Sequence, residues 1–408
     1  MRRDPLADGP WLSIVLLSIT VMTAFGIMFY GFSVYLTDAA AGSEFSTTVL
    51  SLGYGGAILS GGVLALPIGR FADRRGVRPI LGLGAVLGFL GLAGFAAAQS
   101  PWQVIAVWWL LIGPAGAMTF YEPAFVAVDQ WCTPQQRPRA LATLTVIGGL
   151  AGVLFIPGTE RLVNAFGWRT AALTFGLLML VTAGGTALFG IPSRLHKHLP
   201  ADHPSPSGPP LAALLRDPRF RRYTAAMMLT FFAIQGIFFH RVARFEEVGF
   251  AVAGVALWAA AASALSLPGR WVAPLIATRF RATSVHAAVT LAVAGTSLLM
   301  VTGTASWQMI GHFTLFGVGF GAMLPLRPMV MSDWYSGEGY GRVMGAQWTA
   351  TALAGAAGPI TVGVLRDQTG GYELPIGVLV VVLIAAAMLI LASGRSTDST
   401  SARITERR

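Results

Sequence analysis

The chain has 408 residues, of which 54% are hydrophobic and only 11% are charged, and its mean hydropathy is +0.65. Soluble domains are on average about one quarter charged, so this composition excludes a soluble globular protein and predicts a membrane protein. The net charge of +10 does not indicate nucleic-acid binding, because the basic residues cluster between apolar runs, as at the cytoplasmic face of a membrane.

Twelve apolar runs are long enough to cross a bilayer, for which about 20 residues suffice. The predicted spans are 11–37, 47–70, 79–98, 103–131, 137–164, 169–192, 220–245, 251–277, 283–303, 306–332, 342–366 and 373–393. The first run is too long for the apolar part of a signal peptide and has no clear small-residue cleavage site, so no cleavable signal is expected. The single cysteine, Cys132, excludes an intramolecular disulfide.

The basic residues predict the orientation of these spans. With the N-terminus inside, 21 of the 28 lysines and arginines fall in inner segments and five in outer segments. Positive charge is retained on the cytoplasmic side. We therefore expect a multi-pass protein of the plasma membrane, a bacterial inner membrane, with both termini cytoplasmic.

A proline-rich stretch, 192–222, divides the spans into six and six. Proline at this density suits a linker and forbids a continuous helix. We expect an N-terminal six-helix bundle over 1–192, a cytoplasmic linker over 193–219, and a C-terminal six-helix bundle with a short cytoplasmic tail over 220–408.

The two halves resemble each other locally. Glu122-Pro123 precedes Trp131 near the end of the fourth run, and Arg327-Pro328 precedes Trp334 near the end of the tenth. Parallel halves of this kind are typical of transporters in which two helical bundles move around a site near the middle of the membrane.

One arginine, Arg270, lies inside the apolar stretch 263–281. A charge at membrane depth costs a few kcal/mol and is by default a functional candidate. The alternative is an arginine that extends to the interface from near the end of its run. If Arg270 faces a cavity, the protein handles anions.

The loop after the second run reads GRFADRRGVRP from Gly69. Asp73 can accept charge-assisted hydrogen bonds from arginines or cap a neighbouring helix terminus, and Arg74 follows it. This loop resembles the signature between the second and third helices of the major facilitator superfamily, which latches the two halves in the outward-facing state. The alternative is a solvated basic loop placed there by topology alone.

Further motifs resemble the monocarboxylate transporter family. They are Asp8-Gly9-Pro10-Trp11, Glu44-Phe45-Ser46, the run 137–152, Phe166-Gly167-Trp168-Arg169, Ala356-Ala357-Gly358-Pro359 and the run 367–372. The resemblance implies an all-α membrane protein of the major facilitator fold, with twelve transmembrane helices in two pseudo-symmetric six-helix bundles, and a monomer.

The same resemblance implies roles for individual residues. In this family and in the related oxalate/formate antiporters, an arginine of helix eight binds the substrate carboxylate, and Gly269-Arg270 matches that position. Tyr121 matches a site-lining tyrosine of helix four. The other candidates for substrate binding are Phe29, Tyr30, His240 and Gln347. The rings of Phe29 and Tyr30 could equally pack in the core, and His240 could be structural.

The departures from the family bear on proton coupling. Ser266 stands where animal members carry a proton-carrying aspartate, and the lysines of helices one and eleven are absent. Glu122 is an alternative proton site, because burial and a nearby arginine shift a carboxyl pKa in opposite directions. We hypothesise that Glu122 and Arg327 form an ion pair that gates the inner side; each charge could instead be satisfied within its own bundle.

These observations predict a secondary active transporter of small organic anions, monocarboxylates above all, working by alternating access with proton coupling. Its partners would be the anion, a proton and the lipid bilayer, with no nucleic acid and no cofactor. An anion exchanger or a drug or metabolite exporter of the same fold is the alternative. A transport-dead sensor or a membrane enzyme is disfavoured, since the sequence has no catalytic or metal-ligating constellation.

Overall fold

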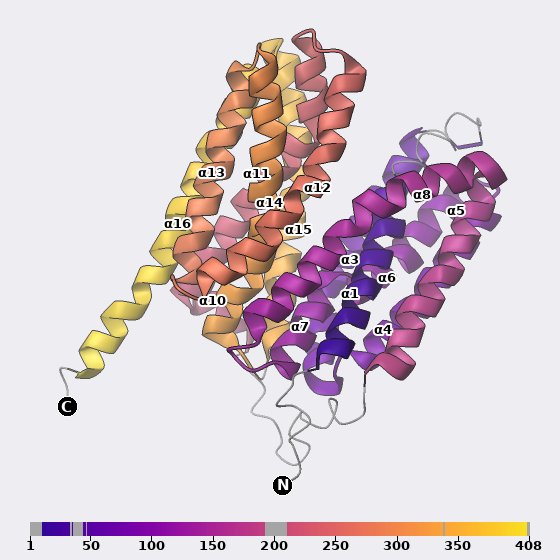
Figure 1. Cartoon of the computed structure of the whole chain (residues 1–408). Helices are drawn as coiled ribbons and strands as arrows, with labels where there is room; N and C mark the ends of the chain where they lie inside the picture. Colours follow the sequence, from indigo (N-terminus) through magenta and orange to yellow (C-terminus); the bar gives the residue numbers. More distant parts are fainter. Residues whose placement is uncertain are drawn as a thin grey trace. The chain divides into compact units, whose positions relative to one another are not determined.

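The protein was analysed as a computed structural model that describes residues 10–32, 35, 44–45, 47–191, 210–337 and 339–405. Every regular element among these residues is a helix (Figure 1). Apolar chain in a bilayer satisfies its backbone hydrogen bonds within each segment, which favours helices over open strands. The expected all-α fold class is confirmed.

The chain separates into two compact units. The first comprises residues 1–208 and 331–349, and the second comprises residues 209–330 and 350–408. The end of helix α14 and the first turns of helix α15 therefore group with the first unit. Residues 193–209 of the predicted linker lie outside the described residues, as do Asp8, Gly9 and Ser46 of the quoted motifs.

Helices of the first half of the chain make up most of the first unit. Their bounds are α1 (Trp11–Phe25), the π-helical turn η1 (Gly26–Tyr30), α3 (Thr47–Arg75), α4 (Arg78–Ala97), α5 (Pro101–Val107), the π-helical turn η2 (Trp108–Ile112), α6 (Gly113–Thr119), α7 (Tyr121–Trp131), α8 (Arg137–Met179) and the π-helical turns η3 (Leu180–Gly184) and η4 (Thr186–Gly190).

The remaining helices follow the linker. Their bounds are α10 (Leu211–Arg216), α11 (Pro218–Glu247), α12 (Val252–Ala277), α13 (Ala282–Thr302), α14 (Ser306–Tyr335), α15 (Tyr340–Thr369) and α16 (Glu373–Thr405).

Ten stretches among the described residues are long and apolar enough to cross a membrane. One of them, 137–190, holds the predicted fifth and sixth spans, which join at Gly167 with φ 77° and ψ 161°. Only glycine adopts this conformation without strain. Helix α12 supplies the eighth predicted span, so each of the twelve predicted spans overlaps with helix among the described residues.

Aromatic rings dominate the core of the first unit. Phe95, Trp108 and Trp168 are buried, and the Phe95 ring contacts Trp108 edge-on and Trp168 at a tilt. In the second unit, α11 and α13 both pack against α16, and the core includes Phe245, Phe313 and Phe316. These cores hold in place the polar groups described next.

Candidate functional site

An aromatic cluster in the first unit contains three of the predicted substrate-binding residues. Phe29 stacks on Phe25 with ring centroids 4.7 Å apart, and Phe25 meets Tyr30 and Tyr121 edge-on at 5.9 and 5.5 Å. The rings come from α1, η1, α3 and α7 and from the chain next to them. The aromatic cluster consists of Phe25, Phe29, Tyr30, Phe32, Tyr54, Phe120 and Tyr121.

Local backbone irregularities position these rings. Phe29 and Tyr30 lie in the π-helical turn η1, and Tyr121 begins α7 after a break at Phe120, whose ψ is −161°. Single π-helical turns occur often at functional sites, and broken helices often form transporter binding sites. The sequence did not predict either feature.

Two glycines of α8 pack closely against the tyrosines of the aromatic cluster. A Cβ atom at Gly148 would lie 2.4 Å from the Tyr121 hydroxyl, and one at Gly152 would lie 3.1 Å from the Tyr30 ring. Both glycines belong to the run 137–152 that carried the family resemblance. The run is thus a complementary surface for the two rings.

Arg270 is buried in α12, with 4% of its surface exposed. Its Nε donates to the Ser266 hydroxyl at 3.2 Å, and that hydroxyl donates to the Ser263 carbonyl at 2.7 Å. Ser266, one turn earlier, therefore orients the guanidinium. Gly269 lets α14 approach, since a Cβ there would lie 2.0 Å from the Val318 carbonyl oxygen.

His240 contacts protein through both ring nitrogens. Nε2 lies 3.0 Å from the Pro359 carbonyl oxygen, and Nδ1 lies 3.3 Å from the Tyr372 hydroxyl. The carbonyl can only accept, so Nε2 carries the proton and the tyrosine donates to Nδ1. A substrate contact at His240 would replace one of these bonds, which favours its structural interpretation.

Asp73 at the end of α3 caps the N-terminus of α15. Its carboxylate accepts hydrogen bonds from the backbone N–H of Gly341 at 2.7 Å and of Arg342 at 2.9 Å. A carboxylate there also interacts favourably with the helix dipole. Of the two modes expected for Asp73, the structure has helix capping, while Arg74 is exposed.

The contact between α3 and α15 depends on glycines and a neighbouring carboxylate. A Cβ at Gly69 would lie 2.0 Å from the Gly341 carbonyl oxygen, and one at Gly345 would lie 2.4 Å from that of Ala65. Thr349 donates to the Gly62 carbonyl at 2.6 Å. We call this close contact, held by Asp73, the α3–α15 clasp.

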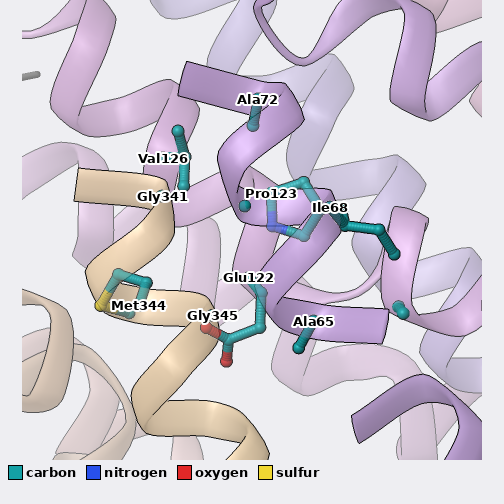
Figure 2. A pocket seen from close by; sticks show the side chains of 11 residues that line it. Ala65, Ile68, Ala72, Glu122, Pro123, Val126, Gly341, Met344 and Gly345 are labelled. Carbon is teal, nitrogen blue, oxygen red and sulfur yellow. The ribbon is translucent and has the colours of Figure 1, made fainter. Parts of the chain in front are cut away.

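Glu122 lines a small cavity beside the clasp. Figure 2 shows its carboxylate next to the turns of α15 that carry Gly341, Met344 and Gly345. The cavity measures about 10 Å³, which is room for about one water molecule and not for an organic anion. This space can therefore serve a proton or a water but is no substrate site.

A second carboxylate, Asp129, strengthens the same end of the first unit. It accepts from the Gly337 backbone N–H at 2.9 Å and pairs with Arg137 at 3.0 Å. Arg137 also donates to the Asp129 carbonyl at 3.0 Å. Asp129 thus pairs with the arginine at the start of α8.

Two predicted residues remain. Gln347 is fully buried in the part of α15 that groups with the first unit. Arg327 is buried in the part of α14 that belongs to the second unit. The Glu122–Arg327 ion pair stays a prediction.

Two motifs that are distant in the sequence meet in the first unit. Arg169 forms an ion pair with Glu44, and the Phe45 and Trp168 rings contact edge-on at 6.1 Å. The Glu44-Phe45 and Trp168-Arg169 segments of the family signature are thus direct partners.

The two helical units, with charges buried inside apolar spans, define a multi-pass membrane transporter. The sequence profile of the Major Facilitator Superfamily matches residues 11–359, and the chain belongs to this superfamily. It is a transporter and not an enzyme.

Several curated relatives are named monocarboxylate transporters. Monocarboxylate transporter 11 of Homo sapiens is 28% identical over 324 residues, which cover 76% of this chain and 67% of that protein. Monocarboxylate transporter 13 of Rattus norvegicus is 26% identical over 412 residues, covering 96% and 90%. The family resemblance found from the sequence motifs is confirmed.

Solved structures share the fold. The human organic anion transporter MFSD10 (TETRAN) aligns with a TM-score of 0.73 at 17% identity, covering 95% of this chain and 100% of that one. The E. coli fucose:proton symporter FucP aligns with a TM-score of 0.72 at 13% identity, covering 94% and 97%. At this identity they establish the fold alone.

Proposed function

We propose that this transporter carries small organic anions, monocarboxylates above all, by alternating access coupled to protons. The observation that carries the proposal is Arg270, a guanidinium only 4% exposed within an apolar helix. The relatives named monocarboxylate transporters support the substrate class.

Arg270 is suited to hold a carboxylate. A guanidinium remains charged at any physiological pH and presents parallel N–H groups that match the two carboxylate oxygens. Ser266 holds Nε, so the plane is oriented before substrate arrives. A single guanidinium at the site suits a monoanion better than a dianion.

The α3–α15 clasp is the proposed conformational element. Asp73 stabilises it through two backbone N–H groups, and its glycines leave no space for a side chain. We propose that the clasp is formed in one state of the transport cycle and broken in the other. Arg74, being exposed, would contribute through the charge of the loop alone.

Glu122 is the proposed proton site. It lines a cavity that has room for about one water next to the clasp, so protonation there can be linked to opening of the clasp. Its pairing with Arg327 would supply the reversible charge contact.

The test is uptake of a panel of radiolabelled monocarboxylates into proteoliposomes, with and without an inward proton gradient. We expect gradient-stimulated uptake that Arg270→Gln reduces at least about tenfold, the effect of losing a charged hydrogen-bond partner. Arg279→Gln, which removes an exposed arginine beyond the end of α12, is the matched control and should leave uptake unchanged.

Other outcomes separate the alternatives. Uptake that ignores the gradient and responds to internal anion would mean exchange, which the serine at position 266 favours. Uptake that is absent, or unchanged by Arg270→Gln, would contradict the proposal and favour an exporter of other compounds.

A further inference from the structure

We propose that the second unit binds anionic phospholipids at the end where α11 and α13 begin, through five arginines that we call the basic patch. These are Arg216, Arg221, Arg222, Arg279 and Arg281, and all five are exposed. The proposal concerns the lipid around the protein, and it does not depend on the proposed transport function.

The basic patch lies where three apolar helices of the unit end. Helices α11 and α13 begin there, and the apolar part of α16 ends there at Gly394. Arg222 donates to the Ala392 carbonyl at 3.5 Å, and Arg281 donates to the Gly394 carbonyl at 2.8 Å. Carbonyl groups two residues apart in a helix are separated by about 3 Å along its axis. The end of α16 therefore holds arginines from two separate segments close together.

The charge of the basic patch is not neutralised by nearby acidic residues. Its other three arginines pair with no carboxylate among the described residues. The segments 211–222 and 279–284 contain one acidic residue, Asp217, whose carboxylate accepts the Arg219 backbone N–H at 2.8 Å as the cap of α11. The patch is thus a concentration of positive charge that attracts anions.

Apolar side chains accompany these arginines at the surface. Phe280, between Arg279 and Arg281, is 65% exposed, and Leu215, next to Arg216, is 54% exposed. A guanidinium binds phosphate oxygens through parallel N–H groups, and an exposed apolar side chain gains free energy from contact with acyl chains. A phospholipid offers both chemical groups, whereas a free phosphate ion would leave the apolar side chains in water.

Retention of basic segments in the cytoplasm explains why arginines lie near span ends, but it does not explain their arrangement. Retention requires positive charge and no particular contacts. In the basic patch, carbonyls of α16 orient two guanidiniums, and a phenyl ring is exposed between two arginines. Clusters of about four to eight basic residues beside the cytoplasmic end of a span bind anionic headgroups. The arrangement matches this kind of site.

Native mass spectrometry of the purified protein, released from a neutral detergent, tests the proposal. The protein is titrated with phosphatidylglycerol or with phosphatidylcholine carrying the same acyl chains, and both dissociation constants are measured. We expect phosphatidylglycerol to bind at least about tenfold more tightly. This preference should shrink as the salt concentration rises, because salt screens exposed charges.

Two double variants locate the bound lipid. Arg221→Gln with Arg279→Gln removes two exposed arginines and leaves the contacts with α16 in place. Each arginine near an anionic surface strengthens binding about fivefold, so this variant should weaken phosphatidylglycerol binding at least about tenfold and phosphatidylcholine binding less than about twofold. Arg161→Gln with Arg366→Gln is the matched control, which removes the same charge outside the patch and should change neither affinity.

Phe280→Ser tests the apolar part of the site and should weaken phosphatidylglycerol binding about fivefold. Equal affinity of the native protein for the two lipids would overturn the proposal, as would equal losses in the two double variants or a preference that survives both. Displacement of the lipid by an equal concentration of inorganic phosphate would identify a site for the free anion and would also overturn it. The lipid preference, its salt dependence and the phosphate competition are measured on the native protein, so they decide the matter even if a variant does not fold.

Discussion

Buried arginines in the second unit differ in what holds them. Arg244, 3% exposed, donates to the Val301 carbonyl at 3.0 Å and pairs with Glu373 at 3.1 Å. Arg241, 5% exposed, lies over the Phe238 ring at 4.0 Å. For Arg244, the desolvation cost is offset by partners on two other helices, and for Arg241 it is offset by the face of an aromatic ring. These contacts suit Arg241 and Arg244 to stabilise the unit.

Arg244→Gln should therefore lower stability. It removes the ion pair and weakens the bond to Val301, and we expect the free energy of unfolding to fall by about 2 kcal/mol. The measurement is the apparent melting temperature of the purified protein in detergent. Arg366→Gln is the matched control, because its pair with Glu247 has side chains 43% and 34% exposed and should cost less than about 1 kcal/mol. Equal melting temperatures for the two variants would contradict a structural role for Arg244.

At the scale of helices, the α3–α15 clasp joins residues about 270 positions apart. Two hydrogen bonds from the α15 N-terminus to Asp73 fix the register, and the glycines fix the distance. The negative charge of Asp73 therefore strengthens these two hydrogen bonds, since hydrogen bonds to a charged acceptor are about twice as strong as neutral ones.

Asp73→Asn should open the clasp more often. The variant keeps one oxygen acceptor and loses the charge, and a loss of about 1 kcal/mol should raise the open population about fivefold. A reporter is maleimide labelling of Met344→Cys, which is 1% exposed when the clasp is formed. Burial raises the pKa of the native Cys132 thiol to about 12, so this thiol stays protonated and unreactive.

Two comparisons make the clasp test specific. Asp217→Asn removes a carboxylate that caps its own helix α11, through Arg219 N–H at 2.8 Å, and should leave labelling at 344 unchanged.

Gly345→Ala should raise deuterium uptake in the first turns of α15, because the added Cβ would meet the backbone of α3. Gly55→Ala is the matched control and should not raise this uptake, because a Cβ at Gly55 has open space. Identical behaviour of each variant and its control would count against the clasp.

Sequence patterns predicted the helices and singled out Asp73 and Tyr121, but they did not predict which residues surround these two. Apolar runs and turn glycines are local signals, so the spans and the junction at Gly167 follow from them. The contact of Tyr54 with Phe29, and of Gly345 with Ala65, joins helices that no local pattern connects. Glu122 was expected to meet Arg327 from matched positions in the two halves, and the structure adds α15 glycines as its neighbours.

At the scale of the whole chain, the five arginines assigned to the outer side are mostly held by the protein itself. Arg169 pairs with Glu44, Arg244 with Glu373 and Arg366 with Glu247. On the assigned inner side, Arg137 pairs with Asp129, while Arg74, Arg139 and Arg279 are exposed. The basic residues are also unequally distributed, with 21 in inner segments against five in outer segments, and an excess of basic residues retains a segment in the cytoplasm.

This asymmetry predicts the orientation in the membrane. Gln99 lies between α4 and α5, Gln135 lies between α7 and α8, and both side chains are exposed. In intact cells, a membrane-impermeant maleimide should label Gln99→Cys and should reach Gln135→Cys only after permeabilisation, because the second loop borders Arg137 and Arg139 on the cytoplasmic side. The native protein, with its buried Cys132, supplies the unlabelled background. The reverse pattern would place both termini outside, so that the exposed arginines would have been translocated and the clasp end of the first unit would face the exterior.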